Sequence, residues 1–231
     1  MKVDIGIIGA MEPEVEAIIA TLEEKASETV SGITFYTGKI GEKTVAVAKC
    51  GIGKVFAALC AEIMILKYSP DLLVNTGVGG ALASGITTGD IVIAGDLCQH
   101  DMDTSPIGDP VGLVSGINKI YFEADQKISQ KLTNCVVALG GKALAGCIAS
   151  GDQFVAAPEK KAYIKETFGA IACEMEGGAI AHVATVNGTP FAVLRAISDS
   201  ADGDATMDYP TFTRLAAERS VATLRAYLRS L

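Results

Sequence analysis

Histidine and arginine are both scarce in this chain, and each shortage argues against a kind of site. The 231 residues contain two histidines, His100 and His182, so a histidine-rich metal centre is disfavoured and we expect no metal and no cofactor. Arginine is absent before Arg195. Because guanidinium groups hold phosphate through paired hydrogen bonds, most of the chain offers poor means of gripping a phosphate group.

The chain also lacks an excess of positive charge, a metal-like cysteine spacing and a long apolar run. Its net charge of −8 argues against a sequence-independent grip on nucleic acid. The six cysteines form no C-x-x-C pair, so we expect buried, reduced thiols in a cytoplasmic protein. No apolar run reaches membrane-spanning length and no signal-like segment is seen, so we expect no membrane partner.

Hydrophobic residues make up 49% of the sequence, which suits one domain over residues 1–231 with a sizeable core. Strand-like and helix-like segments alternate, with some adjacent strand pairs, and this pattern predicts a three-layer α/β domain with a mixed central sheet. The segments predicted as strands are Val3–Gly9, Ile33–Lys39, Val45–Lys49, Leu72–Thr76, Ile91–Ala94, Ala143–Ala149 and Phe191–Ile197. The segments predicted as helices include Lys54–Tyr68, Glu123–Ala138, Glu159–Thr167 and Pro210–Leu231.

Two carboxylates, Glu174 and Glu176, follow the apolar run Ile171–Cys173 and precede two glycines and a small-residue helical pattern. A buried strand that leads into a helix here would place both carboxylates at the mouth of a pocket, where the dipole of a helix N-terminus favours negative charge. Such a carboxylate can accept hydrogen bonds from two neighbouring hydroxyls, as on a ribose. The alternative is a solvated corner, since most glutamates are exposed.

Glycine-rich segments provide a second set of candidates. Gly6–Gly9 lacks the G-x-G-x-x-G spacing of a dinucleotide fold. Gly51–Lys54 resembles a phosphate loop, but Ala48 and Val55 stand where that loop needs glycine and Ser or Thr. Gly77–Gly80 follows a predicted buried strand, where a missing Cβ lets a ligand approach the backbone. The alternative there is a plain tight turn.

Acidic and aromatic side chains also follow predicted strands. Asp199 ends a strand, where α/β proteins place ligands. There it would hold a purine, donating a proton to N7 and accepting from the exocyclic amine, or cap the next turn. Glu12 and Glu14 follow the first strand, where one would act as a general base for water, or both would be solvated acids of a first helical turn. Phe154 would stack on a base or belong to the core.

Six motifs occur in one order along the chain: G-A-M-E-P-E-V, C-G-I-G-K-V, N-T-G-x-G-G, S-G-D-x-F, E-M-E-x-x-A-I-A and R-A-I-S-D-x-A-D. Together they resemble the bacterial methylthioadenosine/S-adenosylhomocysteine nucleosidases of the nucleoside phosphorylase superfamily, over nearly the whole chain. The resemblance implies a three-layer fold with a twisted mixed sheet, a homodimer and no cofactor. It also implies hydrolysis of an N-glycosidic bond that releases adenine and a thio-substituted ribose.

The resemblance also implies roles for particular residues. Asp199 matches the acid that protonates adenine N7, Glu14 the residue that activates water, and Glu176 the ligand of the ribose hydroxyls. The matched positions around them are Met175 against the ribose, Phe154 and Val155 at adenine, and Met11, Ile52 and Tyr209 as apolar lining, the last two towards the thioether. With Glu174, Gly79 and Ser198 they form the expected substrate-binding set.

Two positions depart from the family pattern. Val78 stands where these nucleosidases commonly carry Ser near the attacking water, so the backbone or Glu14 would carry more of the water's positioning. Ile107 stands where they carry an aromatic residue, in the loop that the dimer partner donates. The preference for the 5′-substituent is therefore left open.

Three other functions remain as alternatives. A phosphorylase needs arginines for phosphate, and their absence before Arg195 favours hydrolysis. A hydrolase acting on futalosine-type nucleosides would have similar apolar and acidic parts. A non-catalytic purine-binding protein is disfavoured, because Glu14, Glu176 and Asp199 are all present.

Overall fold

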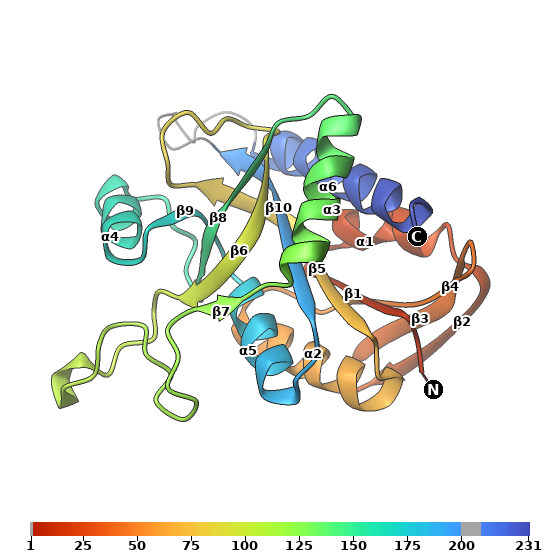
Figure 1. Ribbon diagram of the computed structural model, residues 1–231, viewed down its shortest axis with the longest axis horizontal. Coiled ribbons are helices and arrows are strands. Elements are labelled where there is room, and N and C mark those ends of the chain that lie inside the picture. Colours follow the sequence, from red (N-terminus) through yellow and green to blue (C-terminus); the bar gives the residue numbers. More distant parts are fainter. Residues whose placement is uncertain (1, 200–208) are drawn as a thin grey trace.

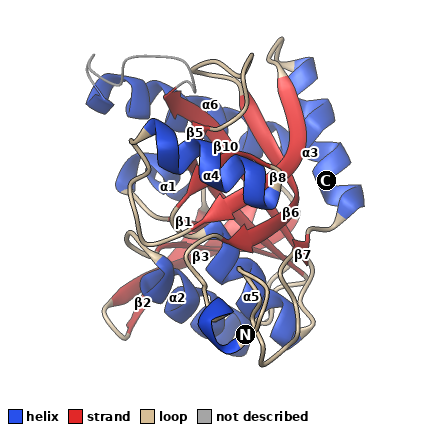
Figure 2. Cartoon of the chain, turned by 90° about the vertical axis from the view of Figure 1, so that its left-hand side faces the viewer, coloured by secondary structure: helices blue, strands red, loops and turns tan. Residues whose placement is uncertain are grey.

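The computed structural model describes residues 2–199 and 209–231, without the side chains of residues 209–213. Within these residues ten strands form one twisted mixed sheet, and helices cover both of its faces (Figures 1 and 2). The predicted three-layer α/β architecture is confirmed.

The strands are β1 (Ile5–Gly9), β2 (Glu23–Val30), β3 (Ile33–Ile40), β4 (Lys43–Lys49), β5 (Leu72–Ala81), β6 (Ile91–Gln99), β7 (Phe122–Glu123), β8 (Ala143–Ser150), β9 (Ala170–Glu174) and β10 (Phe191–Asp199). The helices are α1 (Glu12–Ile19), α2 (Lys54–Tyr68), α3 (Gln126–Ala138), α4 (Pro158–Phe168), α5 (Gly177–Asn187) and α6 (Tyr209–Arg229), with a short 3-10 turn η1 (Ser105–Ile107). The strand order is β10-β6-β8-β9-β5-β1-β4-β3-β2, with β7 beside β6. Because β10 also pairs with β5, the strands from β10 to β5 close into a ring.

The core divides into two main apolar layers, one on each side of the sheet. Neighbouring residues of a strand point to opposite faces. Ile7 of β1 therefore packs in the layer beneath α1, α3 and α6, whereas Ile8 packs in the layer beneath α2 and α5. Both side chains are fully buried. This two-sided burial explains why the central strands have continuous apolar sequences instead of alternating ones.

Local sequence signals fix the ends of three of the helices. Pro158 occupies the first turn of α4, where its missing N–H costs no hydrogen bond. Gly169 ends α4 in the left-handed conformation, at φ 63°, and Gly188 ends α5 in the same way. Asp125 caps α3 by accepting a hydrogen bond from the backbone N–H of Ile128. This cap places the start of α3 after Glu123, which belongs to β7.

Several strands differ from the sequence-based expectation: β2 and β7 were not predicted, and β5 and β6 run further than predicted. Strand β2 is polar and almost entirely exposed, so it shows no buried stripe by which it could be predicted. Strand β5 continues through Gly77–Gly80 to Ala81, so this segment is an extended strand and not a tight turn. It stays extended because it pairs with β10 along one edge and with β9 at its end.

The segment between β6 and β7, residues 100–121, extends away from the sheet and carries η1 (Figure 1). Ile107, in η1, is 82% exposed. Among the described helices, none combines the length and the apolar character needed to cross a bilayer.

Candidate active site

One pocket lies at the ends of β5, β9 and β10 and contains about 600 Å³ of empty space, its open mouth included. It brings together most of the residues that the sequence analysis selected, which are Met11, Glu14, Ile52, Val78, Gly79, Phe154, Val155, Glu174, Met175, Glu176, Ser198 and Asp199. Ile107 does not line the pocket of its own chain, and the side chain of Tyr209 lies outside the described residues.

Glu14 sits in the first turn of α1 and points into the pocket. Its Oε2 accepts the backbone N–H groups of Ala10, at 2.7 Å, and Met11, at 2.9 Å, and its Oε1 accepts that of Val78 at 3.1 Å. The side chain is almost fully buried, and this burial raises its pKa although Arg195 and the three N–H groups act in the opposite direction. A carboxylate held rigidly with a raised pKa is suited to accept a proton.

Gly77 of β5 provides the space that Glu14 occupies. A Cβ at Gly77 would lie 2.8 Å from Glu14 Oε1. The glycines of β5 are therefore needed for the close approach of a side chain, which replaces the tight-turn explanation at this position.

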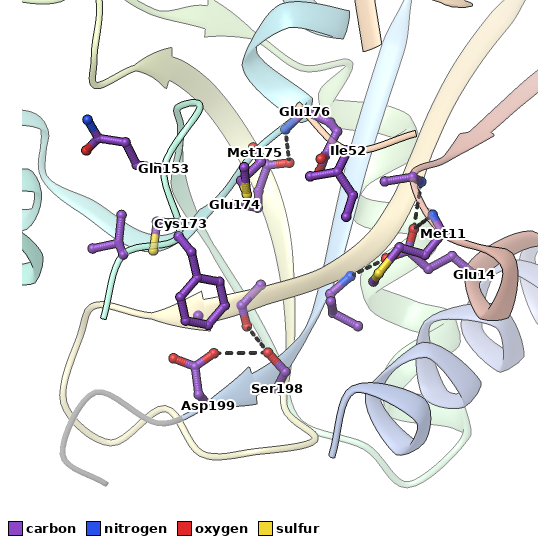
Figure 3. A pocket seen from close by; sticks show the side chains of 16 residues that line it. Met11, Glu14, Ile52, Gln153, Cys173, Glu174, Met175, Glu176, Ser198 and Asp199 are labelled. Carbon is purple, nitrogen blue, oxygen red and sulfur yellow. Dashed lines mark hydrogen bonds between the residues drawn. The ribbon is translucent and has the colours of Figure 1, made fainter. Parts of the chain in front are cut away.

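Asp199 ends β10 on the other side of the pocket from Glu14 (Figure 3). Its Oδ1 accepts the hydroxyl of Ser198 at 3.0 Å, and Lys161 of α4 lies 3.3 Å from its Oδ2. A Cβ at Gly80 would come within 3.0 Å of the same carboxylate. The structure therefore places Asp199 against the backbone of β5, in an ion pair that the sequence did not predict.

Glu176 is the N-cap residue of α5, and its Oε1 accepts the backbone N–H of Gly53 at 2.9 Å. Burial, followed by the negative charge of Glu174, raises the pKa of Glu176 to about 7. Asp152 accepts the next N–H, that of Lys54, at 2.7 Å. Carboxylates of the protein thus occupy the N-terminus of α2, so the segment Gly51–Lys54 is not an open phosphate loop.

Glu174 lies beneath the pocket and is held by an internal network. Its Oε1 accepts the hydroxyl of Ser150, and its Oε2 contacts the guanidinium of Arg195. Burial opposes its ionisation, but Arg195, Ser150 and backbone N–H groups outweigh that effect and lower its pKa. Arg195 also donates to Asn75. Both Glu174 oxygens are therefore engaged inside the protein, and the first arginine of the chain is engaged with them.

Apolar side chains line the remaining surface of the pocket. Val155 is buried, and Met11 and Met175 are partly exposed, whereas Phe154 and Ile52 are 61% and 57% exposed. The last two therefore lie at the mouth, where a bound molecule would cover them. Such a surface suits a flat ring and an apolar substituent better than a free phosphate.

Sequence reasoning missed several residues around the pocket. Ala10, Gln153 and Cys173 line it, and so does Gly80, which belongs to the glycine segment that the sequence had already selected. Gln153 lies inside the S-G-D-x-F motif, so the motif itself offered a signal for it. Lys161 offered none, because it is one of several lysines in a polar helix. Within the described residues no group of three or more His, Cys, Asp or Glu side chains is arranged to hold a metal ion.

Comparison with known proteins identifies the family of this chain. The model of the phosphorylase superfamily matches residues 4–229. This chain belongs to that superfamily. It is 38% identical over 229 residues to the 5′-methylthioadenosine/S-adenosylhomocysteine nucleosidase of Shewanella halifaxensis, a match that covers 98% of this chain and 99% of the relative.

Solved structures agree with the sequence relatives. The nucleosidase of Neisseria meningitidis in complex with methylthio-immucillin-A superposes with a TM-score of 0.93 at 33% identity, over 98% of this chain and 99% of the other. The futalosine hydrolase of Helicobacter pylori superposes with a TM-score of 0.92 at 33% identity, over 98% of this chain and 97% of the other. These matches show the fold and the family of this chain. One of the two solved structures is named a nucleosidase and the other a hydrolase.

Proposed function

We propose that this protein hydrolyses the N-glycosidic bond of 5′-methylthioadenosine and S-adenosylhomocysteine and releases adenine and the thio-substituted ribose. The observation that supports this most is the convergence of Glu14, Glu176 and Asp199 on one pocket from three elements far apart in the chain. The nucleosidase names of the full-length relatives point to the same reaction. This activity belongs to nucleoside catabolism and to methionine salvage.

The leaving group is the first problem that the site addresses. Asp199 in its protonated form donates a proton to N7 of adenine, so the base departs neutral and the sugar becomes oxocarbenium-like. Phe154 and Val155 hold the base, and Met175 packs on the ribose. General acid help of this kind contributes roughly a hundred- to ten-thousand-fold in rate.

Water is the second reactant. Glu14 accepts one proton of a water molecule while the oxygen of that water bonds to the anomeric carbon of the ribose. The bond between this carbon and the base breaks. The backbone N–H of Val78 donates a hydrogen bond to Glu14 Oε1 at 3.1 Å. Position 78, where the nucleosidases that this chain resembles commonly carry Ser, therefore contributes to the site through its backbone. Glu176 accepts the ribose hydroxyls, and Glu174 supports the floor instead of contacting the substrate.

A futalosine-type nucleoside is the second candidate substrate, because the Helicobacter pylori futalosine hydrolase has nearly the same fold at a similar identity. A phosphorylase is disfavoured. Arg195, the first arginine of the chain, is buried and paired with Glu174, which takes it away from any phosphate.

Adenine release in phosphate-free buffer tests the proposal. The substrates compared are methylthioadenosine, S-adenosylhomocysteine, 5′-deoxyadenosine and aminofutalosine. We expect release from the first two, and an Asp199→Asn variant that binds substrate but turns it over far more slowly. Release that requires added phosphate would instead assign a phosphorylase, and absence of release from all four would favour a purine-binding protein.

We also propose a homodimer in which the loop around Ile107 of a second copy completes the pocket. Ile107 is 82% exposed, and α2 presents exposed Val55 and Phe56 close to Ile52 at the mouth. A second copy would cover this apolar surface. Light scattering should give twice the chain mass, and Ile107→Asp should raise KM. A monomer with unchanged KM in this variant would contradict the proposal.

The cytoplasm is the compartment that we propose. All six cysteines are free thiols, including Cys98 and Cys147, which form no disulfide although the Cys147 thiol donates a hydrogen bond to Cys98 Sγ at 3.9 Å. A reducing compartment maintains such thiols. Fractionation of cells that produce the protein tests this assignment.

A further inference from the structure

The start of α2 is held by carboxylates from other segments of the chain. Its N-cap residue, Gly53, adopts φ 98° and has no side chain with which to accept the N–H groups of the first turn. Glu176 accepts the N–H of Gly53 at 2.9 Å, and Asp152, which follows β8, accepts that of Lys54 at 2.7 Å. The donor that Glu176 uses therefore lies on a glycine backbone with little stiffness of its own.

Lys54 and Asp152 form a closed ring of hydrogen bonds with Asp101, in the segment after β6. Asp101 Oδ1 lies 2.6 Å from Lys54 Nζ, and its Oδ2 accepts the backbone N–H of Asp152 at 2.9 Å. The Lys54 and Asp101 side chains are only 19% and 17% exposed, so water screens this ion pair less than a surface pair. Burial opposes ionisation of Asp101, but its hydrogen bonds outweigh that effect and lower its pKa. The ring thus ties the start of α2 to the segments that follow β6 and β8.

We propose that the ring of Lys54, Asp101 and Asp152 positions the Glu176 carboxylate for the ribose hydroxyls, an inference that rests on the proposed function. The ring acts by fixing the N–H of Gly53, because Lys54 directly follows that glycine and a shift of its backbone moves the donor. Lys54 and Asp152 lie in the C-G-I-G-K-V and S-G-D-x-F motifs, yet the reaction proposed above gives neither of them a role. They are positioning residues, since they act through Glu176.

Loss of the ring should weaken the hold on the ribose hydroxyls and leave the base-binding surface as it is. Lys54→Met removes the ammonium, and Asp101→Asn leaves one acceptor oxygen for two donors. In both variants the KM for methylthioadenosine should rise roughly tenfold, the scale of one hydrogen bond to a charged group. An analogue without ribose hydroxyls, 5′-methylthio-2′,3′-dideoxyadenosine, should inhibit both variants with the wild-type Ki.

Matched variants separate this effect from a general loss of structure. Lys67→Met removes a lysine paired with Glu28 from the other end of α2, and it should leave KM and Ki unchanged. Glu176→Gln weakens the direct ligand and should raise KM without changing Ki. A damaged pocket or a lost dimer would disturb the base or the 5′-substituent, which both ligands share, and would raise KM and Ki together. Asp101→Asn serves if Lys54→Met does not fold.

The experiment distinguishes the inference from the proposed function. Adenine release by the wild type without phosphate tests the function, and absence of release would overturn it. With release established, a raised KM and an unchanged Ki in the ring variants support the inference. An unchanged KM, or a parallel rise in KM and Ki, would overturn the inference and leave the proposed function intact. A Glu176→Gln variant with the wild-type KM would overturn the ribose assignment and the inference together.

Discussion

Glu174 and Arg195 form an ion pair beneath the pocket in which each side chain is only 1% exposed. The pair joins the end of β9 to β10, and the Glu174 carboxylate also accepts the backbone N–H groups of Glu176 and Gly177. The turn that presents Glu176 to the pocket is thereby fixed from below. The same pair keeps the first arginine of the chain from acting as a phosphate ligand.

Removal of one partner of this pair should destabilise the protein strongly. Arg195→Met leaves the Glu174 carboxylate buried without its counter-ion, and the expected loss in the free energy of unfolding is about 3–5 kcal/mol. Urea denaturation measures it. The double variant Glu174→Gln/Arg195→Met leaves no isolated charge and should recover part of the loss. A double variant as unstable as the sum of the two single variants would show that the ion pair is not the cause.

Glu14→Gln should slow hydrolysis severely, because an amide cannot accept the proton of water. We expect kcat to fall roughly a hundred- to ten-thousand-fold. All three hydrogen bonds to Glu14 come from N–H donors, so the new NH₂ group faces a donor and stability falls by about 1–3 kcal/mol. Adenine release and thermal unfolding measure the two effects. A lower melting temperature with unchanged turnover would make Glu14 a structural residue.

Gly77→Ala should impair catalysis through Glu14, since its Cβ would lie 2.8 Å from Glu14 Oε1. The carboxylate must then move away from the water position, and kcat should fall more than KM changes. Gly95→Ala is a matched control in β6 of the same sheet, where the nearest contact of a Cβ is 3.9 Å. Equal kinetic effects of the two substitutions would argue against a specific demand for glycine at position 77.

Glu176→Gln should change how stability depends on pH. The pKa of Glu176 is raised from 4.5 to about 7, so the folded state binds a proton that the unfolded state releases between these values. The stabilisation from this group is complete below pH 4.5 and is lost as pH rises through 7, a change of about 3 kcal/mol at most.

The glutamine variant carries no such charge. The melting temperature of Glu176→Gln minus that of the wild type should therefore be larger at pH 8 than at pH 5. Glu159→Gln, which removes an exposed carboxylate from α4, is the control and should give the same difference at both pH values. A Glu176→Gln difference that does not vary with pH would mean that burial does not perturb this group.

Elements with a strong local pattern were predictable from sequence. The apolar run of β1, the length of α2 and the proline at the start of α4 each carry their own signal, and all three elements were predicted. Strand β2 was not, because its exposed residues show no buried alternation and it is held by pairing with β3. The extension of β5 through Gly77–Gly80 also depends on partners distant in sequence.

The site shows the same division. Motif order alone selected Glu14, Glu176 and Asp199, since each lies next to a strand end in a recognisable local sequence. The sequence determined that these acids are present, that arginine is missing before Arg195, and that the core is apolar enough for an α/β domain. Only the tertiary structure decided that Arg195 pairs with Glu174 and that Lys161 pairs with Asp199. Such pairs form between side chains that separate strands and helices bring together. The spacing of residues along one segment does not encode the distance between side chains on two different segments.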